Sequence, residues 1–298
     1  MSAVLVTGAT GLVGQQLLAQ LPSARVLSRN PARAEALLPG STAYKWLPQD
    51  GPPPVAALDG VRTVYHLAGE SVAGGRWNDK RKKALVSSRV TATRNLVEGL
   101  KHMVTKPQVL VVASAVGVYG DRGDTWLNES SEPGDGFLAE LCCNWEKEAM
   151  RAESFGVRVV CLRLGLVLSK EGGALARMLP PFKWGLGGPL GSGRQWMSWI
   201  HVDDVVGLFL HAAQSAELSG PVNGVSPHPA SNRDFSRALG KALHRPVLFR
   251  VPQLALTVAL GELSSVLLSS QRVEPKRALH SGYRFLFPDL AGALAQAI

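Results

Sequence analysis

The chain has few cysteines and no long apolar run. Its 298 residues include only Cys142, Cys143 and Cys161, which form neither a disulfide framework nor a metal-ligand spacing, so we expect a reducing cytoplasm and no bound metal. No stretch reaches the roughly 18 uninterrupted apolar residues of a membrane span. The best candidate, residues 254–268, carries Glu262. A strand pattern beginning at residue 3 also predicts no cleavable leader, and we expect no membrane partner.

Acidic residues are outnumbered by basic ones. Asp and Glu together number 23 against 32 Lys and Arg, a formal net charge of +9. Much of the excess lies between Arg76 and Lys106, where only Asp79 and Glu98 are acidic. Either a solvated helix face or a polyanion site would give this pattern. No nucleic-acid-binding motif accompanies it, so we expect a solvated face and no nucleic-acid partner, although a basic surface would also steer anionic ligands.

Glycine, in contrast, recurs at short intervals near the start of the chain. The apolar, mostly β-branched residues 3–7 are typical of a strand, and Gly8, Gly11 and Gly14 follow before the helix-compatible residues 15–20. Glycines there allow a tight turn, close approach of a pyrophosphate and close helix–strand packing. The free N–H groups of the helix N-terminus attract an anion. This stretch therefore predicts a dinucleotide site.

The end of the next expected strand, residues 24–29, indicates which dinucleotide is bound. Proteins that prefer NAD place a carboxylate there for the ribose hydroxyls, whereas this chain has Ser28 and Arg29. An arginine can pair a phosphate through two N–H groups. We therefore predict NADP(H), the alternative being that Arg29 is simply exposed to solvent.

Further strand and helix patterns alternate along the chain. Strands are expected at residues 41–47, 61–69 and 108–115, with a long helix over 77–100. The last of these strands brings Ser114 to its carboxyl end, the edge where open α/β sheets bind ligands. His66 is expected to be a packed strand histidine. The alternation predicts an α/β fold with a doubly wound parallel sheet.

Four motifs together resemble a known superfamily. They are the glycine turn at residues 7–14, His66–Gly69, Ser114–Gly120 and Trp199–Asp204. In this order and spacing they resemble the extended short-chain dehydrogenase/reductase superfamily across essentially the whole chain. Residues 141–146, 185–193 and 282–288 are similar, more narrowly, to its epimerase-like (NAD-dependent epimerase/dehydratase-like) branch.

The resemblance implies a Rossmann-type fold and a set of cofactor contacts. The phosphate loop would comprise Gly8, Thr10, Gly11, Leu12, Val13 and Gly14. Ser28 and Arg29 would hold the 2′-phosphate of NADP(H), and Leu67 and Ala68 would line the ribose with Gly69 beside them. Residues 163–168 would form the sixth strand, whose end near Val167 would pass the nicotinamide. Arg89 aligns with an asparagine of the relatives, and is either a second cation for the phosphates or a surface arginine. Any homodimer is expected through the long helices after the fourth and fifth strands.

The chain departs from the superfamily at the catalytic pair. Short-chain reductases use a Tyr-x-x-x-Lys motif for proton transfer, but the expected helix, residues 137–149, contains no tyrosine. Cys142 and Glu146 occupy the same i, i+4 spacing, and a neighbouring carboxylate raises a thiol pKa instead of lowering it. Ser114, which would orient a substrate oxygen, is the one catalytic position retained.

We expect a dinucleotide-binding part and a smaller α+β part facing the substrate. Residues 1–170 would form the NADP(H)-binding domain, with 195–215 and 220–226 returning to it. Residues 171–194 and 227–298 would form the substrate side, beginning with a loop-rich segment after Gly172 and including a mostly apolar helical stretch over residues 251–269. The histidine and aspartates of residues 201–204 are expected to be structural, not metal ligands.

Two functions fit these features. The first is an NADP(H)-dependent oxidoreductase or epimerase acting on a small carbonyl or hydroxyl substrate that the sequence does not identify. The second is a nucleotide-sensing binding or regulatory protein that kept the cofactor site and lost catalysis.

Overall fold

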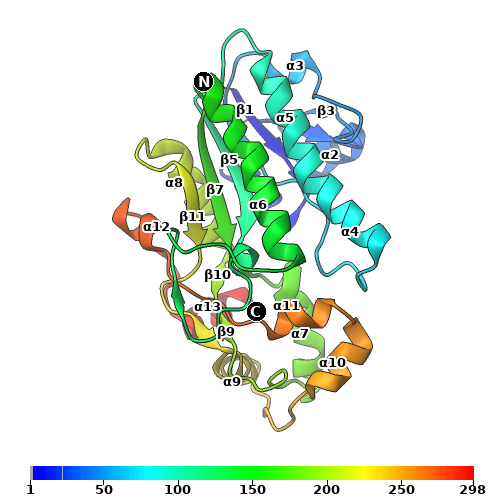
Figure 1. Cartoon of the computed structure of the whole chain (residues 1–298), viewed down its shortest axis with the longest axis vertical. Coiled ribbons are helices and arrows are strands. Elements are labelled where there is room, and N and C mark those ends of the chain that lie inside the picture. Colours follow the sequence, from blue (N-terminus) through cyan, green and yellow to red (C-terminus); the bar gives the residue numbers. More distant parts are fainter. Residues whose placement is uncertain (1–2, 22) are drawn as a thin grey trace.

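A parallel β-sheet organises the chain, which we describe from a computed structural model covering residues 3–21 and 23–298. Seven of the described strands form it, in the order β11-β7-β5-β4-β1-β2-β3, and every neighbouring pair is parallel. Helices cover both faces of the sheet (Figure 1). The predicted α/β fold with a doubly wound parallel sheet is therefore confirmed.

The strands of the main sheet are β1 (Ala3–Thr7), β2 (Arg25–Ser28), β3 (Thr42–Lys45), β4 (Val61–His66), β5 (Val109–Ala115), β7 (Arg158–Leu164) and β11 (Gly220–Gly224). The remaining strands pair two by two: β6 (Trp126–Leu127) with β13 (Arg272–Val273), β8 (Leu166–Leu168) with β10 (Trp199–His201), and β9 (Trp196–Met197) with β12 (Ala230–Ser231).

The helices of the first two thirds of the chain are α1 (Leu12–Ala19), α2 (Pro31–Leu37), α3 (Val55–Leu58), α4 (Asp79–Val86), α5 (Ala92–Lys101), α6 (Phe137–Met150), α7 (Gly173–Lys183) and α8 (Val202–Gln214). Those that follow are α9 (Asn232–Ala242), α10 (Gln253–Leu260), α11 (Leu263–Leu268), α12 (Lys276–His280) and α13 (Leu290–Ala297). Two short 3-10 helices, η2 (Val116–Tyr119) and η3 (Arg151–Phe155), follow β5 and α6.

Each face of the main sheet has its own apolar core. On one face, strand residues such as Val6 and Val111 pack with α1, α2 and α8, for example with Leu17 and Phe209. On the other face, strand residues pack with α3, α5 and α6. Burial of both faces is why the strands are nearly continuous apolar runs, as parallel sheets require.

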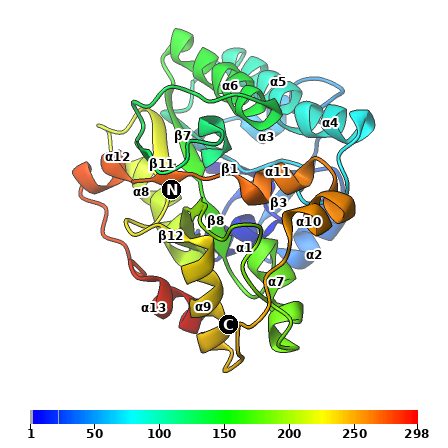
Figure 2. The same ribbon diagram turned by 60° about the horizontal axis from the view of Figure 1, so that its bottom comes forward.

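A third core joins the elements that lie beyond the carboxyl edge of the sheet. It packs α7, α9 and α13 against β8 and β10 around the fully buried Trp199 and Phe235. Figure 2 shows α7, α9 and α13 together on the side of the molecule opposite α5 and α6. Among the described residues, no helix has both the length and the apolar character needed to cross a bilayer.

Several local expectations were wrong. The helix expected over 77–100 begins at Asp79 and contains a π-helical segment, η1 (Ser87–Thr91), between α4 and α5. The strand expected at 163–168 starts earlier and is interrupted at Gly165, where a Cβ would come within 2.4 Å of the Ser198 carbonyl oxygen. The segment after Gly172 is the helix α7, which contains two prolines in its second half. The apolar stretch 251–269 is divided by Gly261, whose φ is +61°.

Candidate functional site

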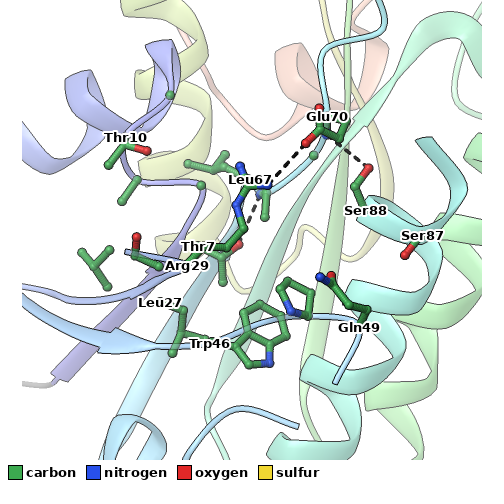
Figure 3. A pocket seen from close by; sticks show the side chains of 18 of the residues that line it. Thr7, Thr10, Leu27, Arg29, Trp46, Gln49, Leu67, Glu70, Ser87 and Ser88 are labelled. Atoms are coloured by element: carbon green, nitrogen blue, oxygen red, sulfur yellow. Dashed lines mark hydrogen bonds and ion pairs between the residues drawn. The ribbon is translucent and has the colours of Figure 1, made fainter. Parts of the chain in front are cut away.

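A cavity of about 500 Å³ opens at the carboxyl edge of the main sheet. The ends of β1, β2 and β4 and the loops after them form most of its wall (Figure 3). This is the edge at which parallel α/β sheets bind nucleotides. Its lining residues are Thr7, Gly8, Ala9, Thr10, Gly11, Val26, Leu27, Ser28, Arg29, Trp46, Pro48, Gln49, Leu67, Ala68, Gly69, Glu70, Ala84, Ser87 and Ser88.

The glycine turn forms one wall of the cavity and requires glycine at two positions. Gly8 has a φ of +69°, and a Cβ there would lie 2.6 Å from the backbone carbon of Leu67. A Cβ on Gly14 would lie 2.4 Å from the Gly8 carbonyl oxygen. The turn therefore packs backbone against backbone, and its first half stays open to the cavity while α1 begins at Leu12.

His66 and Thr7 fix the relative position of the two strands that flank the turn. The Thr7 hydroxyl lies 2.7 Å from His66 Nδ1, and Thr93 Oγ1 lies 2.9 Å from Nε2. Thr7 Oγ1 also accepts from the Ala68 N–H at 3.2 Å. Burial lowers the pKa of His66 to about 3, so the ring is neutral. His66 is the packed histidine that the sequence indicated.

Ser28 and Arg29 lie at the end of β2, where the sequence placed the 2′-phosphate. Ser28 Oγ accepts from the Asn30 N–H at 3.1 Å, which orders the turn into α2. Arg29 extends into the cavity with its side chain 73% exposed, and its guanidinium lies 3.5 Å from Glu70 Oε1 (Figure 3). Arg81 approaches the other Glu70 oxygen at 3.4 Å. Glu70 thus stands between two cations at the cavity wall.

The sequence did not indicate the part of the wall formed by Trp46, Pro48 and Gln49, which follow β3. Trp46 is nearly buried, and its indole N–H donates to the Gly51 carbonyl at 2.9 Å. An aromatic face and a proline beside a dinucleotide cavity are suited to a flat base. The one sequence signal that could have indicated this role is the position of these residues at the end of the third strand.

Arg89 lies beside the cavity but is not part of its lining. It comes from the π-helical segment, and its guanidinium donates to the Glu70 carbonyl at 2.8 Å and lies 5.3 Å from the centre of the Trp145 ring. A Cβ on Gly69 would come within 3.2 Å of the Arg89 guanidinium carbon. Burial lowers the pKa of Arg89. The side chain is therefore a half-buried cation at the Gly69 end of the cavity, not a surface arginine.

Ser114 is buried near the end of β5 and does not line the cavity, and its hydroxyl donates to a carboxylate. Its Oγ lies 2.6 Å from Glu146 Oε1, and the residue is 4% exposed. Glu146 comes from α6, where it lies four residues after Cys142, the spacing that separates lysine from tyrosine in the superfamily's motif. The structure thus brings the retained serine into contact with a carboxylate of α6.

A buried network extends from this pair. Arg163 of β7 donates from Nε to Glu146 Oε1 at 2.9 Å and from Nη2 to Oε2 at 2.8 Å. Its Nη1 donates to the Tyr119 hydroxyl at 3.0 Å, which in turn donates to Asn223 Oδ1 at 2.8 Å. Burial alone would lower the pKa of Arg163, but the hydrogen bonds and the charge of Glu146 outweigh it and raise that pKa. Sequence spacing indicated neither Arg163 nor Asn223.

Cys142 lies on α6, four residues before Glu146. It is 4% exposed, and burial together with the charge of Glu146 raises the pKa of its thiol to about 12. A thiol that stays protonated is neither a nucleophile nor a proton relay at neutral pH. The expectation that Cys142 and Glu146 do not imitate the tyrosine–lysine pair agrees with these surroundings.

The cavity lining does not include Leu12, Val13 or Val167, which the sequence also predicted to contact the cofactor. Leu12 and Val13 are half-buried in the first turn of α1, and Leu12 packs near Gly172 and Gly173. Val167 is half-buried in β8, opposite Ile200 of β10.

The motif at residues 201–204 holds the C-terminal segment in place. Asp204 accepts from the backbone N–H groups of Leu286 and Phe287 at 2.7 and 3.0 Å, and from the Tyr283 hydroxyl. His201 begins α8 by accepting from the Asp203 N–H at 3.2 Å. These groups therefore hold protein segments together.

Comparison with known proteins agrees with this geometry. Residues 4–223 match the NAD dependent epimerase/dehydratase family, and residues 251–297 match a domain of unknown function (DUF1731). The epimerase family protein YfhF of Bacillus subtilis is 38% identical over 300 residues, which cover 99% of this chain and 97% of that protein.

Two solved structures are also similar along the whole chain. A crystal structure of the human epimerase family protein SDR39U1 with NADPH has 33% identity and a TM-score of 0.88, covering 99% of this chain and 98% of that one. A structure described as a nucleoside-diphosphate sugar epimerase from Corynebacterium glutamicum has 36% identity and a TM-score of 0.78, covering 99% of this chain and 57% of that one. These likenesses confirm the predicted resemblance and the expectation of a nicotinamide cofactor. The chain belongs to the NAD dependent epimerase/dehydratase family.

Proposed function

We propose that this protein binds NADP(H) and acts as an oxidoreductase or epimerase on a small substrate that carries a carbonyl or hydroxyl group. The observation that carries the proposal is the cavity itself, in which the glycine turn and the Ser28–Arg29 strand end face each other. The NADPH in the human relative's crystal structure supports the choice of cofactor.

The residues present fit a bound dinucleotide. Gly8 and Gly14 allow the turn to pack closely against the backbone of Leu67 and against itself, and the N-terminus of α1 offers N–H groups to a pyrophosphate. Ser28 and Arg29 would hold the 2′-phosphate. Leu67, Ala68 and Gly69 would lie against the ribose. Val167 would lie at the nicotinamide end.

The cofactor, when bound, supplies hydride chemistry, and the chain must orient the substrate. Ser114 would contact the substrate oxygen. In this proposal residues 1–170, with 195–215 and 220–226, form the NADP(H)-binding domain, and residues 171–194 and 227–298 form the substrate side. We place the protein in the cytoplasm and expect any dimer to form through α4, α5 and α6.

The second candidate, a nucleotide sensor without catalysis, rests on a specific observation. The helix α6 contains no tyrosine, and its two residues with the motif's spacing are a thiol whose pKa is about 12 and a carboxylate paired with Arg163. Neither of these groups donates a proton readily at neutral pH.

Titration of the purified protein with NADPH, followed by nicotinamide fluorescence, tests the cofactor. Saturable binding is expected, and no binding at high micromolar cofactor would overturn the proposal. The loaded protein is then offered a panel of carbonyl and hydroxyl compounds. Turnover that Ser114→Ala abolishes supports the enzyme, whereas a cofactor that never changes redox state supports the sensor.

Arg89 is proposed as a second cation for the cofactor. Arg89→Met should weaken NADPH binding about tenfold or more, because a charge-assisted contact contributes about 1.5–3 kcal/mol. Arg94→Met is the matched control, since Arg94 lies on α5 and pairs with Glu148 on the surface. Equal affinities for the two variants would remove Arg89 from the cofactor site.

A further inference from the structure

The hydrogen bond between Ser114 and Glu146 fixes which way the serine hydroxyl points. Arg163 donates to both oxygens of Glu146, so the carboxylate is ionised and can only accept hydrogen bonds. The single proton of the Ser114 hydroxyl is therefore directed at Glu146 Oε1, 2.6 Å away. Ser114 Oγ has no other hydrogen-bond partner among the described residues, so its remaining capacity is to accept.

The rest of the network prevents this polarity from reversing. Arg163 cannot accept, and it uses its third hydrogen bond on the Tyr119 hydroxyl. Tyr119 therefore donates onward to Asn223 Oδ1, and Asn223 Nδ2 donates to the Glu274 carbonyl at 3.0 Å. Each group has its role set by its neighbour, and turning the Ser114 proton away would leave a buried carboxylate with one partner fewer.

We propose that Glu146 is a positioning residue that makes Ser114 a hydrogen-bond acceptor, so that the site selects a ligand hydroxyl over a carbonyl. This inference rests on the proposed function, because the ligand binds beside the cofactor. It narrows the substrate class to one whose hydroxyl group donates to Ser114 Oγ in the complex with NADP+.

A matched pair of fluorinated probes tests the proposal without a known substrate. 4,4-Difluorocyclohexanol donates a hydrogen bond, whereas 4,4-difluorocyclohexanone has the same number of heavy atoms and only accepts. The affinity of each probe for the NADP+ complex is measured by ¹⁹F NMR. The alcohol should bind about tenfold more tightly, because a ketone oxygen would face the serine lone pairs with no proton between them.

Two variants separate this preference from pocket shape. Ser114→Ala removes the acceptor, and the Glu146→Met/Arg163→Met double variant frees the serine proton without leaving a buried charge unpaired. In both, the alcohol and ketone affinities should converge to within about threefold. Ser236→Ala, which changes a buried serine of α9, is the control that should keep the wild-type preference.

The outcomes separate this inference from the proposed function. NADP+ binding is measured first, in the absence of probe, and its loss would count against the cofactor site. When the cofactor binds, the inference is overturned if the ketone binds as tightly as the alcohol, if neither probe binds, or if Ser114→Ala keeps the preference. The wild-type measurement and Ser114→Ala decide the matter even if the double variant fails to fold.

Discussion

Glu146 and Arg163 form a buried ion pair in which the guanidinium donates to both carboxylate oxygens, at 2.9 and 2.8 Å. Their side chains are 12% and 8% exposed. Replacing Arg163 alone would leave the buried Glu146 carboxylate without a counter-ion. Arg163→Met should therefore lower the free energy of unfolding by about 3–5 kcal/mol, measured by urea denaturation.

The double variant Glu146→Met/Arg163→Met is the control for this pair. Replacing both charges with apolar side chains of similar length removes the desolvation cost along with the attraction, so the double variant should be more stable than Arg163→Met alone. If the loss of unfolding free energy in the double variant equals the sum of the losses in Glu146→Met and Arg163→Met, the two residues stabilise the fold independently.

His66 should make the stability depend on pH. Its pKa is about 3 in the folded protein, against an ordinary value of 6.5, so the unfolded chain binds the proton more readily. The contribution of His66 to the free energy of unfolding is fully present above its pKa in the unfolded chain, and it is lost as the pH falls below that pKa. Between about pH 7 and about pH 5 this residue should remove about 2 kcal/mol from the free energy of unfolding.

Comparison with His66→Asn isolates this contribution. Asparagine keeps a polar side chain between Thr7 and Thr93 but does not titrate. Urea denaturation at about pH 7 and about pH 5 gives the loss of unfolding free energy between the two pH values for each protein. This loss should be about 2 kcal/mol smaller in His66→Asn than in the wild type. Equal drops in the two proteins would contradict a neutral, buried imidazole.

The elements that sequence could predict are those with a strong local pattern. The strand–turn–helix of β1 and α1 combines a β-branched run with glycines at close intervals, and it was predicted within a few residues. The break at Gly165 was missed because its cause is the Ser198 carbonyl, which approaches from another part of the chain. The helix α7 was read as a loop because Pro180 and Pro181 are helix breakers in most contexts.

The site was predictable only where the residues are close in sequence. The spacing of Cys142 and Glu146 placed both on one helix face, and the end of β2 indicated Ser28 and Arg29. The sequence could not predict the role of Arg163, because this residue contacts Glu146 only through the packing of α6 on β7.

Gly14 should matter for folding more than for cofactor contact. In Gly14→Ala the new methyl group would meet the Gly8 carbonyl oxygen at 2.4 Å, and the neighbouring contacts are also backbone. We expect a loss of about 1–3 kcal/mol in unfolding free energy, as for other overpacked sites. In Gly11→Ala the closest approach is 3.2 Å, so this variant should lose less stability but bind NADPH more weakly. Calorimetry measures the stability of both variants, and titration measures their NADPH affinity. If Gly11→Ala loses more stability and Gly14→Ala loses more affinity, these roles of the two glycines are wrong.

Glu70 and a bound 2′-phosphate should compete for Arg29. The ion pair at 3.5 Å is exposed and therefore weak, so a phosphate that accepts from two guanidinium N–H groups would displace the carboxylate. Arg29→Ala should weaken NADPH binding about tenfold or more and leave NADH binding nearly unchanged. Arg33→Ala, an exposed arginine on the adjacent helix, is the matched control.

Glu70→Gln should act in the opposite direction. Removing the competing negative charge should strengthen NADPH binding by about twofold to fivefold, with a smaller effect on NADH, which lacks the 2′-phosphate. The gain should shrink at high salt, because exposed charges are screened. If Glu70→Gln weakens both cofactors equally, Glu70 holds the cavity wall through Arg81 and does not compete for Arg29, since loss of that contact would change the wall for either nucleotide.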